Sequence, residues 1–188
     1  MSTTSTKNQL LHEASRMLLS KGLNGFGLQE LATKLNIKKS SLFHHYPSKL
    51  AIALELYRYY QSSFTEWATL HEHLTPEKQI LSYGQKLTSW ICEKERVCPV
   101  GALSLEWTLV DAKLKKEIKG LHDLHREWLT QLFKKIHKKS GLRLSVNEAV
   151  LTTMGLIQGS IQLARIHGDT ELVNKNLKSH LKCIKEKS

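Results

Sequence analysis

The sequence predicts an all-α fold of about nine helices, and two observations support this prediction. Leucine, isoleucine and alanine recur at intervals of three and four residues through most of the chain, which is the spacing of one face of a helix. The chain has only three prolines and ten glycines, and these lie between the periodic segments rather than within alternating, strand-like patterns. At 188 residues it is long enough for one or two domains with a sizeable core.

The helix boundaries follow from capping and helix-breaking residues. A Ser or Thr followed three residues later by Glu or Gln forms a capping box, as in Thr6/Gln9 and Ser145/Glu148. A Gly just after the last apolar position ends a helix, and Asp169 is expected to cap the final one. These signals predict helices over 6–21, 28–35, 39–45, 49–70, 76–90, 111–139, 145–167 and 169–185, with a shorter, broken segment over 96–107.

The segment from Gly27 to Lys49 predicts DNA binding. It contains two short helices joined by a tight turn, where Asn36 tolerates the left-handed backbone conformation. A rigid helix pair of this kind places its second helix in the major groove of DNA. Lys39 can donate to guanine, and the Ser and His side chains that follow can reach base edges or phosphates. The alternative from these residues alone is an ordinary solvated helix face.

The charge balance favours a polyanionic partner. With 28 Lys and Arg against 17 Asp and Glu, the formal net charge is +11. The surplus is spread over residues 1–50, 111–139 and the tail from Lys175, so part of it serves solubility. Charge alone therefore does not separate nucleic-acid binding from a soluble basic protein.

Several classes of protein are disfavoured. Three cysteines (Cys92, Cys98 and Cys183) without a secretion signal argue against a disulfide framework, and no apolar run is long enough to span a membrane. We expect a cytoplasmic protein that needs no cofactor. The sequence has no nucleophile–base motif or phosphate loop, so a small α-helical hydrolase or transferase is a weak alternative. A helical adaptor whose helix pair docks protein is another.

Metal binding is also disfavoured. His44 and His45 are neighbours on a helix and point about 100° apart, so they cannot easily share an ion. His122 and His125, with Asp123 between them, could hold a metal, but a core or surface position is favoured. No metal site is predicted.

The first fifty residues contain a series of residues at fixed spacing that is specific to one family. These residues are Ala14, Gly22, Leu31-Ala32, Asn36-Ile37, Ser41-Leu42-Phe43-His44-His45-Tyr46 and Ser48-Lys49. With them, this part of the chain resembles the N-terminal domain of the TetR/AcrR family of regulators. The resemblance implies a DNA-binding domain over 1–47, with the helix-turn-helix over about 28–46 leading into a connecting helix over 48–70. It implies that residues 48–188 form an effector-binding and dimerisation domain.

The resemblance also implies which residues contact DNA. Lys39, Ser40 and Ser41 would face the major groove. Gln29 would touch phosphate or a flanking base, and Lys49 would bind phosphate. The chain departs from the family pattern where Lys38 replaces a capping Ser and where Phe43 replaces a Tyr, which removes a hydroxyl–phosphate bond. The implied DNA-binding residues are Gln29, Lys38, Lys39, Ser40, Ser41, Phe43, His44, His45, Tyr46 and Lys49.

A homodimer is implied by the same resemblance, formed by helices over about 145–167 and 170–186. The residues agree, because apolar positions nearly encircle the helix over 145–167 and its small residues Gly155, Gly159 and Ser160 allow close approach. The alternative is the central helix of a monomeric core. A two-fold dimer would match a palindromic operator in double-stranded DNA.

Aromatic residues indicate where an effector could bind. Tyr57, Tyr60, Phe64 and Trp67 share one helix face, and such a stripe lines either a pocket or a plain core. An apolar or aromatic small molecule fits better than an anion. The candidate pocket residues are Tyr60, Phe64, Trp67, Trp90, Trp107 and Trp128.

Cys98 is a candidate redox-sensing thiol. Residues 98–106 are similar to a Cys-x-x-Gly-x-Leu-x-x-Glu segment in one branch of the family, some of whose members sense electrophiles or oxidants. Nearby basic residues could lower the pKa of the thiol, although a buried residue at a helix junction is the simpler interpretation. The expected function is therefore a transcriptional regulator, a repressor by family default, released by a small effector or by thiol modification.

Overall fold

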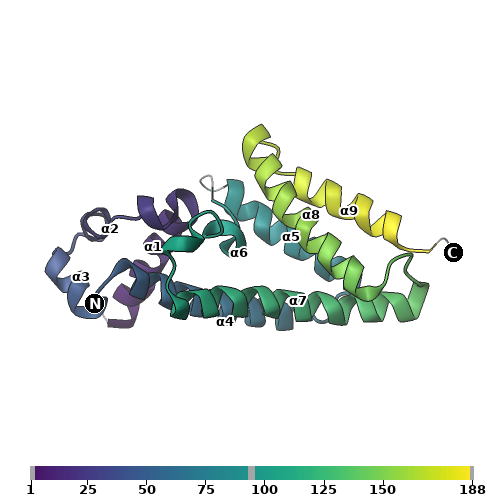
Figure 1. Ribbon diagram of the computed structural model, residues 1–188, viewed down its shortest axis with the longest axis horizontal. Helices are drawn as coiled ribbons and strands as arrows, with labels where there is room; N and C mark the ends of the chain where they lie inside the picture. Colours follow the sequence, from purple (N-terminus) through teal and green to yellow (C-terminus); the bar gives the residue numbers. More distant parts are fainter. Residues whose placement is uncertain (1–2, 93–95, 187–188) are drawn as a thin grey trace. The chain divides into compact units, whose positions relative to one another are not determined.

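The computed structural model describes residues 3–92 and 96–186, and the side chains of residues 3–6, 45 and 90–92 are not described. Within these ranges the chain is all-helical, as predicted (Figure 1). A single isolated antiparallel bridge joins Leu142 to Lys185. The helices are α1 (Thr3–Gly25), α2 (Leu28–Lys34), α3 (Lys39–His45), α4 (Lys49–Leu70), α5 (Pro76–Cys92), α6 (Pro99–Ala102), the 3-10 helix η1 (Trp107–Leu109), α7 (Ala112–Ser140), α8 (Val146–His167) and α9 (Leu172–Ile184).

Capping residues set most of these boundaries where the sequence placed them. Ser48 Oγ accepts the Ala51 N–H at 3.1 Å and so caps α4. At α8, the Ser145 hydroxyl and the Glu148 carboxylate satisfy each other's backbone N–H groups, which confirms the predicted capping box. Gly168 ends α8 in the left-handed conformation, with φ of 66°.

Three boundary predictions were wrong. Helix α1 begins at Thr3, so Thr6 lies inside it rather than capping it. Gly22, with φ of 70°, interrupts α1, but the helix resumes and continues to Gly25. The residue that precedes α9 is Glu171 and not Asp169, because the Asp169 carboxylate accepts the Glu171 N–H and forms a separate turn.

The chain divides into two compact units. Unit 1 consists of the described residues up to Ser62 together with Pro99–Leu121, and unit 2 consists of the described residues from Ser63 to Cys98 and from His122 onward. Helices α4 and α7 each contribute residues to both units. This grouping by packing is distinct from the division into functional domains expected at residue 47.

The core of unit 1 joins the first four helices to the segment that follows Cys98. Apolar residues of α1, including Met17 and Leu18, pack with Leu31 of α2 and Leu42 of α3. The Tyr57 hydroxyl of α4 donates to the Pro99 carbonyl at 2.6 Å. The short helix α6 therefore belongs to the same core as the helix-turn-helix.

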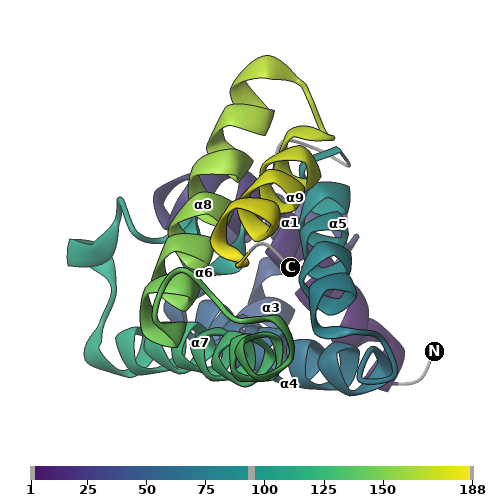
Figure 2. The ribbon, with the colours of Figure 1, turned by 90° about the vertical axis from the view of Figure 1, so that its right-hand side faces the viewer.

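Unit 2 is built on the contact of α5, α8 and α9, which lie side by side (Figure 2). Gly84 allows α5 to approach α9 closely, because a Cβ there would lie 2.6 Å from both Asn174 Oδ1 and Leu177 Cδ1. Helix α7 buries Leu129, Leu132 and Ile136 in unit 2 and Leu114, Ile118 and Leu121 in unit 1. In the described ranges, no helix combines the length and apolarity that a bilayer span requires.

Candidate nucleic-acid interface

The turn between α2 and α3 has the tight geometry predicted from the sequence. Asn36 adopts the left-handed conformation with φ of 53°. The Asn36 N–H donates to the Thr33 carbonyl at 3.1 Å, and the Ile37 N–H donates to the Ala32 carbonyl at 3.0 Å. These bonds end α2 and redirect the chain within a few residues. The orientation of α3 relative to α2 is therefore fixed by backbone geometry.

Helix α3 buries one side chain and exposes its neighbours. Leu42 is fully buried against Leu31 and Ala32 of α2, which anchors α3 to the core of unit 1. The side chains around it point outward, so α3 presents a polar, basic face. The exposed residues are Lys38, Lys39, Ser40, Ser41, Phe43 and His44.

Phe43 and Lys39 form a pair on this exposed face. The Lys39 ammonium lies 5.6 Å from the centroid of the Phe43 ring, at the i, i+4 spacing of a cation–π contact. Phe43 is 42% exposed, so part of its ring is accessible to a partner. The pair places a cation and an apolar ring on the same part of α3.

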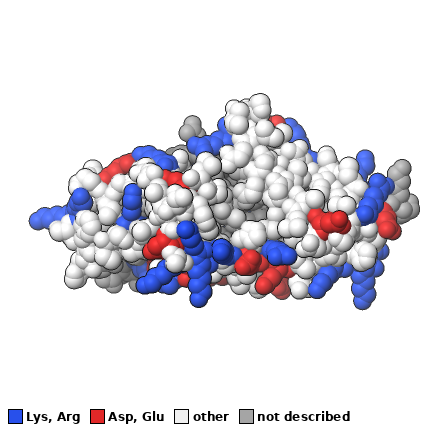
Figure 3. Space-filling model, in the orientation of Figure 1, with Lys and Arg blue, Asp and Glu red and all other residues white. Residues whose placement is uncertain are grey.

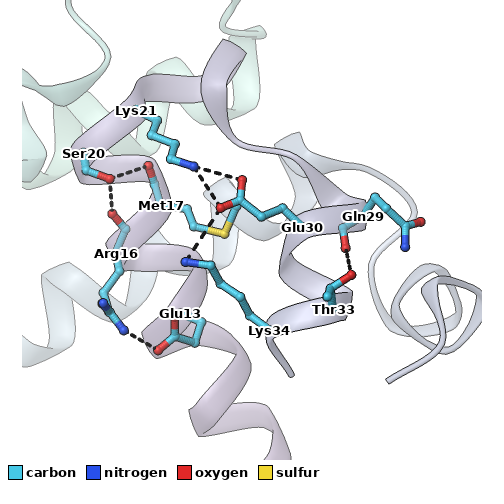
Figure 4. Close-up of polar contacts among 9 residues, drawn as sticks. All are labelled: Glu13, Arg16, Met17, Ser20, Lys21, Gln29, Glu30, Thr33 and Lys34. Atoms are coloured by element: carbon cyan, nitrogen blue, oxygen red, sulfur yellow. Dashed lines mark hydrogen bonds and ion pairs between the residues drawn. The ribbon is translucent and has the colours of Figure 1, made fainter. Parts of the chain in front are cut away.

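The other predicted DNA contacts have varied surroundings. Gln29 is exposed, and its side-chain amide points away from α1 (Figure 4). Tyr46 is partly buried, and this burial, followed by the charge of Glu55, raises the pKa of its phenol. Lys49 Nζ donates to the Leu23 carbonyl at 2.9 Å, so its ammonium already has one partner inside the protein. The side chain of His45 lies outside the described residues, although its backbone ends α3.

One ion pair joins α2 to α1, and a second lies within α2. The Lys21 ammonium binds the Glu30 carboxylate at 2.8 Å, and Lys34 approaches the same carboxylate at 3.7 Å (Figure 4). Hydrogen bonding to Lys21 is the largest cause of the lowered pKa of Glu30. These exposed pairs add orientation more than stability. They hold the scaffold on which α3 is presented.

Basic side chains project from the α2–α3 region, which lies at the left of Figure 3. Lys and Arg side chains also project from other elements in the same view, in keeping with the spread of charge along the sequence. The electrostatic attraction to a polyanion is thus not confined to α3. The exposed face of α3, rather than the distribution of charge alone, indicates which surface would contact DNA.

Comparison with known proteins agrees with this geometry. Residues 10–56, which run from α1 into α4, match the family described as bacterial regulatory proteins, tetR family. Over 171 residues the chain is 23% identical to the HTH-type transcriptional regulator LmrA of Bacillus subtilis, covering 87% of this chain and 88% of that protein. Its N-terminal domain thus matches the TetR family of transcriptional regulators, and most of the chain is similar to a regulator of the helix-turn-helix type.

Solved structures show that the TetR-type fold extends over the whole chain. A TetR-family regulator from Agrobacterium tumefaciens matches with a TM-score of 0.88 at 20% identity, covering 98% of this chain and all of that one. The regulator FadR from Bacillus subtilis, solved in complex with stearoyl-CoA, matches with a TM-score of 0.72 at 15% identity, covering 95% of this chain and 99% of that one.

Three of the predicted effector-pocket residues lie together in unit 2. The rings of Phe64, Trp67 and Trp128 are neighbours, with the Phe64 and Trp128 centroids 5.5 Å apart and the Trp67 and Trp128 centroids 5.7 Å apart. Tyr83 and His125 complete the group, which we call the aromatic cluster. The Tyr83 centroid is 5.4 Å from that of Trp128, and the His125 centroid is 4.1 Å from that of Phe64.

The remaining pocket candidates lie elsewhere. Tyr60 belongs to unit 1, where its hydroxyl and that of Ser15 are 2.7 Å apart. Trp107 also belongs to unit 1, and its ring lies 5.4 Å from the Lys115 ammonium. The side chain of Trp90 is outside the described residues. The structure thus brings together half of the six residues that the sequence grouped.

Burial controls the protonation of the aromatic cluster. Desolvation lowers the pKa of His125 to about 3, and the charges of His122 and Lys86 act in the same direction. Burial also raises the pKa of Tyr83 well above its usual value, and a charge on Cys98 would add to this effect. Both groups are therefore neutral near pH 7. The Tyr83 hydroxyl lies 3.3 Å from His125 Nε2, so the two polar groups can satisfy each other.

Cys98 is buried in unit 2, immediately before α6. This position suits both alternatives considered from the sequence, namely a thiol at a helix junction and a thiol that becomes reactive on exposure. Among the described residues, no group of three or more metal-binding side chains occurs. His122 instead lies with Nδ1 3.3 Å from the Asp123 carboxylate.

Sequence reasoning missed the functional interest of three residues. Tyr83 and His125 sit within the aromatic cluster, and only the helical spacing of His125 in a buried stripe gave a signal. Glu106 was noted as part of a motif, but its contact with the end of α1 joins residues that are 82 and 83 positions apart. No local pattern predicts a contact of that range.

Proposed function

We propose that this protein is a TetR-family repressor that binds a palindromic operator as a homodimer and is released by a small effector or by modification of Cys98. In this proposal, residues 1–47 bind DNA, while residues 48–188 bind the effector and form the dimer. The protein acts in the cytoplasm on DNA and is not an enzyme. The observation that carries the proposal is the exposed polar face of α3 around the buried anchor Leu42.

The DNA-binding part follows from the side chains that α3 offers. Lys39 can donate to the O6 and N7 of guanine, and the exposed hydroxyls of Ser40 and Ser41 can bond to base edges or phosphates. Phe43 supplies an apolar surface of the kind that contacts thymine methyl groups. Gln29, Lys38, Tyr46 and Lys49 are assigned to the flanking backbone, and His44 and His45 to the groove wall.

The dimer is supported by the exposed apolar face of α8. Leu151 is 50% exposed, Leu163 46% and Ile166 74%, although Val150, Ile157 and Ile161 of the same helix are buried. A Cβ added at Gly155 or Gly159 would have open space around it, so these glycines leave room for a close partner. A second copy of α8 and α9 would cover this face. The two reading helices would then lie one DNA turn, or a multiple of it, apart.

The effector is assigned to the aromatic cluster. Its rings and neutral polar pair, Tyr83 and His125, suit an apolar or aromatic compound that carries one polar group. The structural relative FadR was solved with stearoyl-CoA, which is a precedent for a ligand with a long apolar chain in a protein of this fold. An effector would release DNA only if it bound more tightly to the DNA-free state.

A mobility-shift assay with the palindromic DNA beside the gene tests the proposal. We expect binding to fall steeply with added salt, and Lys39→Ala to weaken it about tenfold or more. Lys138→Ala is the matched control, because Lys138 is an exposed lysine of α7 outside the reading helix. If Lys39→Ala and His45→Ala both kept full affinity, the assignment of α3 would be wrong. Binding without salt dependence would favour a protein-docking adaptor.

A further inference from the structure

Glu106 binds the interrupted end of α1. Its carboxylate accepts the backbone N–H of Leu23 and, at 2.9 Å, that of Asn24. These two N–H groups follow Gly22, whose positive φ turns them away from the helical direction. Gly22 also leaves room for the carboxylate, because a Cβ there would lie 2.5 Å from the nearest Glu106 oxygen. Glycine at position 22 therefore leaves space for a carboxylate, and the two N–H groups of this turn bind it.

The Lys49 ammonium binds the backbone carbonyl of Leu23. The Leu23 carbonyl accepts a hydrogen bond from Lys49 Nζ at 2.9 Å, while the Asn24 N–H, which belongs to the same peptide group, donates to Glu106 at 2.9 Å. An anion at the N–H and a cation at the carbonyl strengthen each other through the main chain. We call this arrangement the Glu106–Leu23–Lys49 contact. It joins three segments of unit 1: the end of α1, the start of α4 and the turn before η1.

The segment that carries Glu106 is itself fixed to the core of unit 1. Leu103 is buried, and the Glu106 N–H donates to the Leu103 carbonyl at 3.3 Å. The Tyr57 hydroxyl holds the beginning of the segment at Pro99. Helix α6 packs against α1 in the same unit (Figure 1). The carboxylate is thus held in place rather than carried by a free loop.

We propose that Glu106 is a positioning residue for DNA binding, which rests on the proposed function above. Its carboxylate fixes the Leu23–Asn24 turn from which the chain continues into α2 and α3. Through the Leu23 carbonyl it also fixes the ammonium of Lys49. A lysine ammonium has three donors, so Lys49 can keep its bond to Leu23 and still donate to a phosphate. The segment that follows Cys98 thereby acts directly on the DNA-reading helices.

The direction in which Glu106→Gln changes DNA affinity distinguishes a positioning role from simple charge repulsion. An acidic side chain on a DNA-binding domain repels phosphate, so its removal should raise affinity for any duplex. If Glu106 positions the reading helices, Glu106→Gln should instead lower affinity for the specific duplex, because glutamine cannot accept both N–H groups as a carboxylate does. Glu13→Gln is the matched control, since Glu13 is an acidic residue of α1 whose carboxylate binds Arg16 of the same helix.

The experiment uses a duplex selected from a randomised library by the wild-type protein. Affinities for this duplex and for a non-specific competitor are measured for wild type, Glu106→Gln and Glu13→Gln, at a temperature where all three are folded by circular dichroism. We expect Glu106→Gln to lose about tenfold in specific affinity and nothing in non-specific affinity. Glu13→Gln should match or exceed wild type on both.

A measurement on the wild-type protein protects the test against misfolding of the variant. The amide protons of Leu23 and Asn24, both hydrogen-bonded to the Glu106 carboxylate, should exchange with solvent more slowly in wild type than in Glu106→Gln. Equal exchange rates in the two proteins, or a Glu106→Gln variant that binds as tightly as Glu13→Gln, would overturn the positioning role. A wild-type protein that selects no duplex would instead refute the proposed function, and the role of Glu106 in DNA binding with it.

Discussion

Lowering the pH should destabilise the protein through His125. Burial among Phe64, Tyr83 and Trp128 lowers the pKa of this histidine from 6.5 to about 3. Between these two values the unfolded chain binds a proton at this site and the folded chain does not. Stability therefore falls as the pH falls from about 6.5 towards 3.

The magnitude follows from the size of the shift. A pH of 5 lies about 1.5 units below the pKa of this histidine in the unfolded chain, and each unit corresponds to about 1.36 kcal/mol. The His125 contribution lost between pH 7.5 and pH 5 is therefore about 2 kcal/mol. This is a sizeable fraction of the stability of a typical domain.

Urea denaturation followed by circular dichroism at pH 7.5 and pH 5 measures this contribution. We compare wild type with His125→Gln, which cannot be protonated in this range, and with His122→Gln, which removes the more exposed histidine. The drop in the free energy of unfolding should be about 2 kcal/mol smaller for His125→Gln than for wild type. His122→Gln should follow wild type closely. Parallel pH dependence of wild type and His125→Gln would refute the reasoning.

Three further predictions address the fold and the dimer. Ser145→Ala removes the capping box of α8 and should lower the free energy of unfolding by about 1 kcal/mol in chemical denaturation. Asn36→Val places a β-branched residue at a φ of 53° and should cost about 1–2 kcal/mol, seen as a lower Tm. Ile166→Glu should yield monomers in analytical ultracentrifugation, whereas Leu70→Glu, at a site 72% exposed on α4, should not. Dimers in both variants would contradict the proposed interface.

Local signals predicted the parts of the fold that local chemistry decides. Ser145 with Glu148, the glycine after His167 and Asn36 in the turn each act on backbone groups a few residues away, so their effect is visible in the sequence. The start of α1 was misplaced because several Ser and Thr residues near the N-terminus could each begin a helix. The resumption of α1 after Gly22 could not be predicted, since the N–H groups after the break are satisfied by distant Glu106.

The candidate sites divide in the same way. The face of α3 could be predicted because Leu42 alone occupies the inner position of a short helix. The aromatic residues of α4 were correctly placed on one face, but their partners depend on tertiary packing. Tyr60 meets Ser15 in unit 1, while Phe64, one turn later, meets Trp128 in unit 2. Periodicity gives the face of a helix and not the element that covers it.

The close packing of the aromatic cluster has a kinetic consequence. The rings of Trp67, Tyr83 and Trp128 touch one another, with centroids between 5.4 and 5.7 Å apart, so a molecule that enters among them must first separate them. Association would then be limited by the rate at which the rings open. In stopped-flow recordings of tryptophan emission, the observed rate should level off at high concentrations of the compound instead of rising in proportion.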